Sequence, residues 1–147
     1  MQKFLNNKVT RETLPIAKGP SSSERIIPDT RGTLIQILNR QDQSFKRLVY
    51  FELHIGLERG HHVHNKEEEH VFIVSGIVQL LVKDMGLEDS KAELIDLRAG
   101  DRITIAPGLA HAYRAISTAQ ALEYSVLFFS DAAANNDRTP CKLDWPD

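Results

Sequence analysis

The sequence predicts an all-β fold, a single sandwich or barrel. Short apolar runs recur between residues 34 and 129, and turn signals separate them, a spacing typical of such folds. Glycines stand at the joins between runs, at Gly76, Gly86, Gly100 and Gly108. The 147 residues are enough for one domain with a substantial core, and a hydrophobic content of 41% fits a thin-walled barrel better than a large α/β core.

Three segments are expected along the chain. Residues 1–26 are polar and contain two prolines and a serine run, so we expect an arm rather than core. Residues 27–130 should form the barrel, and residues 131–147 a polar tail that packs on it. In the tail, Ala132–Ala134 are expected in a short helix, and Trp145 is expected to pin the tail to the barrel. The runs expected as strands are 34–38, 48–55, 71–75, 78–82, 92–97, 103–105, 112–116 and 122–129.

The stretch 60–76 carries the strongest chemical signal. Side chains on a strand alternate between faces, so His62 and His64 should point the same way. Polar residues 65–68 can form a turn, after which an apolar run begins. A hairpin here would place Glu69 on the same inner face as the two histidines.

A further histidine, His111, follows a Pro-Gly turn much later in the chain, so only tertiary folding can bring it to the others. Two histidines and a carboxylate with open positions suit a divalent transition metal, and a further histidine would make four protein ligands. The spacing does not choose among Fe, Mn, Ni, Zn and Co. The predicted metal ligands are His62, His64, Glu69 and His111.

Other interpretations of these residues are less specific. The charged segment 66–69 fits a solvated hairpin tip equally well. His61 and His70 have the opposite strand parity and are expected at the surface or behind the ligands. His54 is expected to be a packed strand residue.

The two clusters resemble the two motifs of the cupin superfamily. The first motif is matched by His62, His64, Glu69 and Gly76, and the second by Gly100, Asp101, Gly108 and His111. Ala106 stands where the second motif usually has its first proline. The resemblance covers about residues 60–111. It implies a single double-stranded β-helix, or jelly-roll, barrel with the metal inside its mouth.

A narrower resemblance is to RmlC-like nucleotide-sugar cupins. Segments 29–34, 45–50 and 59–62 resemble the dTDP-4-keto-6-deoxyhexose 3,4-ketoisomerases and, more distantly, the dTDP-4-dehydrorhamnose 3,5-epimerases. The ketoisomerases have Gln where this chain has Glu69. A metal-binding cupin fused to capsular-sugar epimerase/reductases keeps Glu there. This departure favours a metallated relative.

The resemblance implies an isomerase or epimerase that transfers a proton next to the carbonyl of a nucleotide-linked keto-sugar. Such chemistry needs a base and a group that stabilises the enediolate. With a metal bound, Tyr113, Tyr124 or His54 would be the base; without one it would be His62, which resembles the catalytic histidine of keto-sugar cupins. Three arginines are expected to bind the diphosphate, because guanidinium forks match phosphate oxygens: Arg31, Arg47 and Arg59.

Two other functions fit the same ligands: an iron-dependent dioxygenase of a small molecule, and a non-catalytic cupin that binds a sugar or other ligand. A net charge of −2 without a basic stripe argues against nucleic-acid binding, and no apolar stretch suggests a membrane span or secretion signal. A single cysteine, Cys141, favours a reducing cytoplasm. Similar cupins suggest a homodimer.

Overall fold

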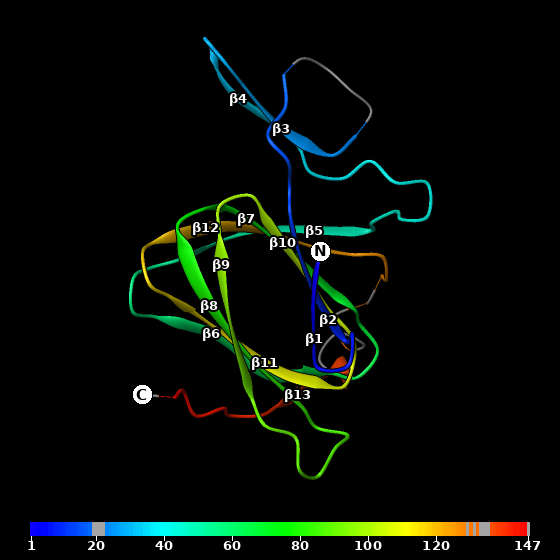
Figure 1. Cartoon of the computed structure of the whole chain (residues 1–147). Coiled ribbons are helices and arrows are strands. Elements are labelled where there is room, and N and C mark those ends of the chain that lie inside the picture. The colour runs from blue at the N-terminus through cyan, green and yellow to red at the C-terminus, as the bar shows by residue number, and fades with distance from the viewer. Residues whose placement is uncertain (19–22, 129, 131, 133–135, 147) are drawn as a thin grey trace.

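The computed structural model describes residues 1–18, 23–128, 130, 132 and 136–146, and in them the fold is nearly all β (Figure 1). A six-stranded sheet has the order β1-β2-β10-β7-β12-β5, and a five-stranded sheet has the order β13-β6-β11-β8-β9. The pairings are antiparallel. The predicted all-β, jelly-roll barrel is confirmed. Within the described residues, no helix is long and apolar enough to cross a membrane.

The strand bounds follow the chain in order. They are β1 Gln2–Phe4, β2 Val9–Thr13, β3 Arg25–Asp29, β4 Gly32–Gln36, β5 Arg47–Leu53, β6 Glu58–His64, β7 Glu69–Ser75, β8 Ile77–Asp84, β9 Glu93–Arg98, β10 Asp101–Ile105, β11 Leu109–Ala115, β12 Ala119–Ser125 and β13 Arg138–Pro140. From β5 to β12, each predicted run lies on a strand. The boundaries differ from the prediction by a few residues.

The two sheets enclose one hydrophobic core, and strand alternation decides which side chains enter it. On β9, Ile95 and Leu97 are buried, whereas the alternating residues Leu94 and Asp96 face outward. Strand β7 is buried along most of its length because β10 and β12 flank it on both sides.

The beginning of the chain differs from the predicted arm, because residues 2–13 belong to the barrel sheet. Strand β2 pairs with β10 over its whole length, from Thr13 opposite Asp101 to Val9 opposite Ile105. Val9 is fully buried in the core. The apolar signal was weak because most side chains of this segment are polar and only partly buried.

Residues 34–38 also differ from the prediction of a barrel strand. Strand β4 pairs with β3 in a separate two-stranded sheet. Figure 1 shows this hairpin projecting away from the barrel. Its apolar residues are therefore not core residues, and Leu34 is largely exposed.

A buried arginine on β10 ties the N-terminal segments to the barrel. Arg102 contacts the carboxylate of Glu12, lies 2.7 Å from that of Glu24, and donates to the carbonyl oxygen of Ile37 at 2.7 Å. Arg40 pairs with the same two carboxylates. Burial by itself would raise the pKa of Glu24, but the hydrogen bonds from Arg102 and Arg40 lower that pKa to about 2.

The C-terminal tail returns to the barrel, as predicted. Strand β13 pairs with β6, and Trp145 packs beside a cluster that contains Leu143 and Ala110. The guanidinium of Arg114 lies 4.4 Å from the centre of the Trp145 ring, so Trp145 does hold the tail on the barrel. Of the predicted short helix, Ala133 and Ala134 lie outside the described residues.

Candidate functional site

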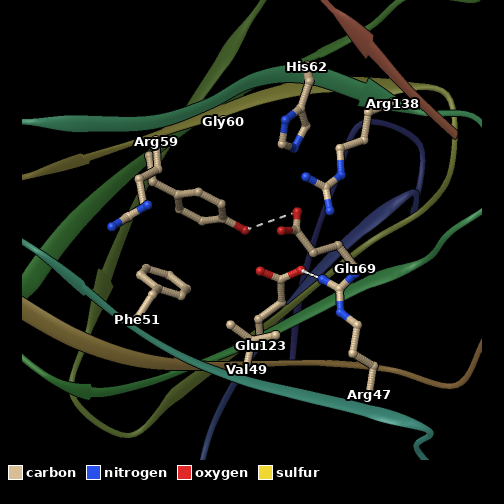
Figure 2. Close-up of a pocket in the computed structure, with 10 residues that line it drawn as sticks. Arg47, Val49, Phe51, Arg59, Gly60, His62, Glu69, Glu123 and Arg138 are labelled. Atoms are coloured by element: carbon tan, nitrogen blue, oxygen red, sulfur yellow. Dashed lines mark hydrogen bonds and ion pairs between the residues drawn. The ribbon is translucent and has the colours of Figure 1, made fainter. Parts of the chain in front are cut away.

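A cavity of about 370 Å³ lies within the barrel (Figure 2). Six strands of both sheets contribute its walls: β5, β6, β7, β11, β12 and β13. The residues that line it are Arg47, Val49, Phe51, Arg59, Gly60, His62, Glu69, Tyr113, Glu123 and Arg138. Val49 and Phe51 give the cavity an apolar wall, and most of its other lining residues are titratable. Such a combination is typical of a small-molecule site.

A β-bulge directs His62 into this cavity. His111 pairs with His62, but Ala112 pairs with Gly60, so His61 is an extra residue on β6. Gly60 and His61 both have positive φ, 97° and 58°. A Cβ on Gly60 would lie 2.8 Å from the carbonyl oxygen of His111, so only glycine fits without a shift of the backbone.

Three histidines lie close together beside the cavity; His62 lines it, and His64 and His111 are buried next to His62. The ring centres of His62 and His64 are 4.7 Å apart, those of His62 and His111 4.8 Å, and those of His64 and His111 5.5 Å. Each offers one ring nitrogen within 4.8 Å of the others. His62 Nε2 is buried and has no hydrogen-bond partner in the described structure. These donors fit a transition metal in kind and spacing.

The fourth predicted ligand, Glu69, lies beside the histidines. Its Oε2 is 2.6 Å from Nε2 of His111, and the hydroxyl of Tyr113 donates to the same oxygen at 3.4 Å. Burial would raise the pKa of Glu69, but the nearby His111 lowers it; burial would lower the pKa of His111, but Glu69 raises it. Burial, and then the charge of Glu69, raises the pKa of Tyr113 well above its usual value. Tyr113 therefore stays a neutral hydrogen-bond donor.

Two further titratable groups have shifted pKa values. Burial, followed by the charges of His111 and His64, lowers the pKa of His62 to about 4, so its ring is neutral at neutral pH. Burial, followed by the charge of Glu69, raises the pKa of Glu123 to about 7. The guanidinium of Arg47 partly opposes this second shift, since it lies 2.7 Å from Glu123 Oε1.

Three arginines reach the cavity, and two of them were predicted. Arg47 and Arg59 line it as expected, and Arg59 also donates to the carbonyl oxygen of Glu52 at 3.1 Å. Arg138 is the third; Figure 2 shows its guanidinium pointing toward the carboxylate of Glu69. Arg31 is not brought there, because it lies on the projecting hairpin, where it pairs with Asp29 at 2.6 Å.

Tyr124 does not reach the cavity either. It neighbours Glu123 on β12, so strand alternation places it on the other face, where its ring stacks on His70 with centres 4.7 Å apart. His54 is exposed and lies in the turn after β5. Of the predicted proton-transfer residues, His62 and Tyr113 are thus the two that line the cavity.

Glu123 and Arg138 were missed by the sequence interpretation. Glu123 had one usable signal, since it is a lone charged residue within an apolar strand run. Arg138 had none, because it lies in a polar tail where an arginine is unremarkable.

Behind His64 lies a second buried group. Nδ1 of His64 is 3.3 Å from Oδ2 of Asp137 and 3.5 Å from Oε2 of Glu67. All three residues are at least 95% buried. Asp137 directly precedes β13, so the tail supplies groups to both sides of the histidine cluster.

A family model, "FdtA: WxcM-like, C-terminal", matches residues 22–119. No curated protein sequence matches the chain. The fold is similar to QdtA, a sugar 3,4-ketoisomerase from Thermoanaerobacterium thermosaccharolyticum in complex with TDP, with a TM-score of 0.70, 18% identity, and coverage of 92% of this chain and 90% of that one. Another QdtA structure, of a variant, contains TDP-4-keto-6-deoxyglucose.

Two further solved structures are also similar. WlaRB, a TDP-quinovose 3,4-ketoisomerase from Campylobacter jejuni, is 26% identical with a TM-score of 0.60, over 75% of this chain and 85% of that one. ChmJ, a 3'-monoepimerase from Streptomyces bikiniensis in complex with dTDP-quinovose, is 15% identical with a TM-score of 0.71. The match covers 90% of this chain and 71% of that one. The first of these likenesses rests on sequence as well as on fold.

Proposed function

Because the chain belongs to the FdtA family of WxcM-like C-terminal domains, we propose that it is an isomerase or epimerase of a nucleotide-linked keto-sugar. The observation that carries the proposal is one cavity that contains an unpaired imidazole nitrogen on His62, a neutral phenol on Tyr113, and arginines. The named activities of QdtA, WlaRB and ChmJ support this class of reaction.

In this proposal, His62 is the base. Its neutral Nε2 removes a proton from the carbon next to the sugar carbonyl and can return it to the former carbonyl carbon while the hydroxyl proton passes to the other oxygen, which completes an isomerisation. An epimerisation would need a second group to donate the proton from the opposite face of the sugar. The enediolate that forms between these steps carries negative charge on oxygen. Tyr113 keeps its proton and donates a hydrogen bond to that oxygen.

The diphosphate is proposed to bind at the arginines that line the cavity. Guanidinium groups present paired donors that match phosphate oxygens. Arg59 and Arg138 have no carboxylate bound within ion-pair distance in the part of the chain that the structure describes, whereas Arg47 is already paired with Glu123. Arg59 and Arg138 are therefore more available to bind an anion, whereas the ion pair with Glu123 holds Arg47 in place.

The metal ion is a separate part of the proposal. His62, His64, Glu69 and His111 fit one divalent transition metal by donor type and spacing. When bound, such an ion would supply Lewis acidity to a sugar oxygen. In that arrangement His62 is a ligand, and Tyr113 is the remaining predicted proton-transfer residue in the cavity; it could act as the base only if the charge of the bound ion lowered the pKa of its phenol. Metal content of protein purified without chelator or a His-tag decides between the two arrangements.

The reaction is tested with TDP-4-keto-6-deoxyglucose in D2O, with NMR detection of deuterium at the carbons beside the carbonyl. Exchange and isomerisation without oxygen consumption support the proposal, and His62→Asn should abolish both. Oxygen consumption that depends on Fe(II) would instead establish the dioxygenase. Tight binding without exchange or oxygen consumption would establish a binding protein.

A homodimer is also proposed, since exposed apolar side chains such as Leu34, Leu48 and Tyr50 lie on the hairpin and on the edge strand β5. Light scattering of the protein in solution tests it. A particle with the mass of one chain would overturn this part.

A further inference from the structure

Asp137 is held rigidly although it lies in the C-terminal tail. Its Oδ1 accepts the backbone N–H of Lys66 at 2.6 Å, and its Oδ2 accepts that of Glu67 at 3.4 Å. The backbone N–H and the side-chain amide of Asn65 both donate to the Asp137 carbonyl oxygen at 2.9 Å. The turn between β6 and β7 is therefore fastened to the tail at this one residue.

The same carboxylate faces His64. Oδ2 of Asp137 lies 3.3 Å from His64 Nδ1, and Glu67 places a second carboxylate oxygen 3.5 Å from that nitrogen. A carboxylate can only accept a hydrogen bond, so Nδ1 must carry the proton. Nε2 is then the nitrogen without a proton, and it is the one left for the cluster with His62 and His111.

We propose that Asp137 is a positioning residue that holds His64 with its proton on Nδ1 and its Nε2 lone pair available to the cluster with His62 and His111. An imidazole that accepts a hydrogen bond or binds a metal through one nitrogen commonly donates the other N–H to a carboxylate, which fixes its tautomer and its orientation. The role deepens the proposed function and rests on it for its catalytic consequence. The tautomer itself does not depend on that function.

Asp137→Asn is the sharpest variant, because it keeps the size of the side chain. The Lys66 N–H must still be accepted at 2.6 Å, so the amide oxygen of Asn would occupy the Oδ1 position. Its NH2 group would then face His64 Nδ1 and donate to it. We expect the proton of His64 to move to Nε2, so that Nε2 no longer offers a lone pair to the cluster with His62 and His111.

The readout is 15N NMR of the imidazole nitrogens in the metal-free full chain, with the His64 signals assigned through His64→Gln. We expect the Nδ1–H tautomer in the wild type and the Nε2–H tautomer in Asp137→Asn. A wild-type ring that is protonated on Nε2, or an unchanged tautomer in Asp137→Asn, would overturn the proposal.

A purely structural role of the tail is tested with Asn65→Ala. This variant removes a hydrogen bond to the Asp137 carbonyl but leaves the carboxylate facing His64. It should lower the unfolding midpoint without changing the tautomer. For catalysis, we expect Asp137→Asn to lower kcat about 10- to 100-fold with little change in KM, and Asn65→Ala to leave both near wild type. If the wild type is inactive on sugar nucleotides but the tautomer switches, only the proposed function fails.

Discussion

Oε2 of Glu69 lies 2.6 Å from Nε2 of His111, although the two residues come from different sheets of the barrel. The pair links β7 to β11 at the inner end of the cavity. Each partner stabilises the charged form of the other: the pKa of Glu69 is lowered and that of His111 is raised. A divalent ion at this position would replace the imidazolium proton as the counter-charge of Glu69.

Loss of Glu69 should therefore reduce metal content. We expect the wild type to bind a divalent transition metal, and Glu69→Ala and His64→Ala each to retain a small fraction of it, with the β-rich circular dichroism spectrum unchanged. Mass spectrometry of the metals is the measurement. Glu68→Ala is the matched control, because Glu68 is exposed and belongs to the same turn. Full metal content in both site variants would show that the predicted ligand set is incorrect.

The two tyrosines should behave differently. Tyr113→Phe removes a buried hydroxyl that donates to Glu69 in the cavity, and we expect kcat to fall on the order of 100-fold. Tyr124→Phe changes a ring on the other face of β12 and should leave kcat near wild type. Steady-state kinetics with the sugar nucleotide compare them. Equal losses in the two variants would remove the catalytic role of Tyr113.

Arg47 should contribute to recognition of the nucleotide part. Arg47→Ala is expected to weaken a nucleotide sugar about tenfold or more while changing affinity for the free sugar much less, since a charge-assisted hydrogen bond to phosphate is lost. Calorimetric titration of both ligands measures the difference. Arg98→Ala, on β9 away from the cavity, is the control. A uniform loss for both ligands would argue against a phosphate contact.

The bulge on β6 predicts a contrast between two glycines with positive φ. Gly108→Ala has open space around its new methyl group, so its cost should be that of the backbone conformation alone, about 1–2 kcal/mol in the free energy of unfolding. Gly60→Ala adds a contact at 2.8 Å with the carbonyl oxygen of His111. We expect a larger loss of stability and a displaced His62. Urea unfolding measures the loss of stability. The rate of D2O exchange into the substrate reports the displacement of His62. Similar costs for both variants would contradict the packing at the bulge.

The arginine–carboxylate network should make stability depend on pH in acid. The pKa of Glu24 is about 2 when folded and has an ordinary value of 4.5. A lowered folded pKa means that the stabilisation is complete above about pH 4.5 and is lost as pH falls toward 2. In Arg102→Met the pKa of Glu24 should return toward its ordinary value. The unfolding free energy of that variant should then fall less steeply between pH 5 and about 3, by urea titration at each pH. A slope equal to that of the wild type would show that Arg102 does not set this dependence.

How far the sequence predicts the structure depends on which residues carry the signal. Strand alternation and motif spacing were sufficient to predict that His62, His64, Glu69 and His111 lie close together, because all four lie on strands. Alternation alone would not have located the extra residue at His61, since a bulge changes parity without changing composition.

Residues outside the apolar strands were harder to place. Strand β2 has one fully buried apolar residue, Val9, so its place in the barrel comes from backbone pairing with β10 rather than from a pattern of side chains. The β3–β4 hairpin shows the opposite case, in which an apolar run lies outside the core. Asp137 and Arg138 depend on where the tail returns, which no local pattern encodes.

Because β13 forms part of its wall, the cavity is built from two parts of the chain, the barrel strands and the C-terminal tail. The family-matched segment ends at residue 119, yet the wall formed by Arg138 and the support behind His64 come from beyond it. Two chains with the same motif residues but different tails would thus present different pockets to a substrate. Exchange of the tail between relatives is a way to change ligand selectivity while every barrel residue stays in place.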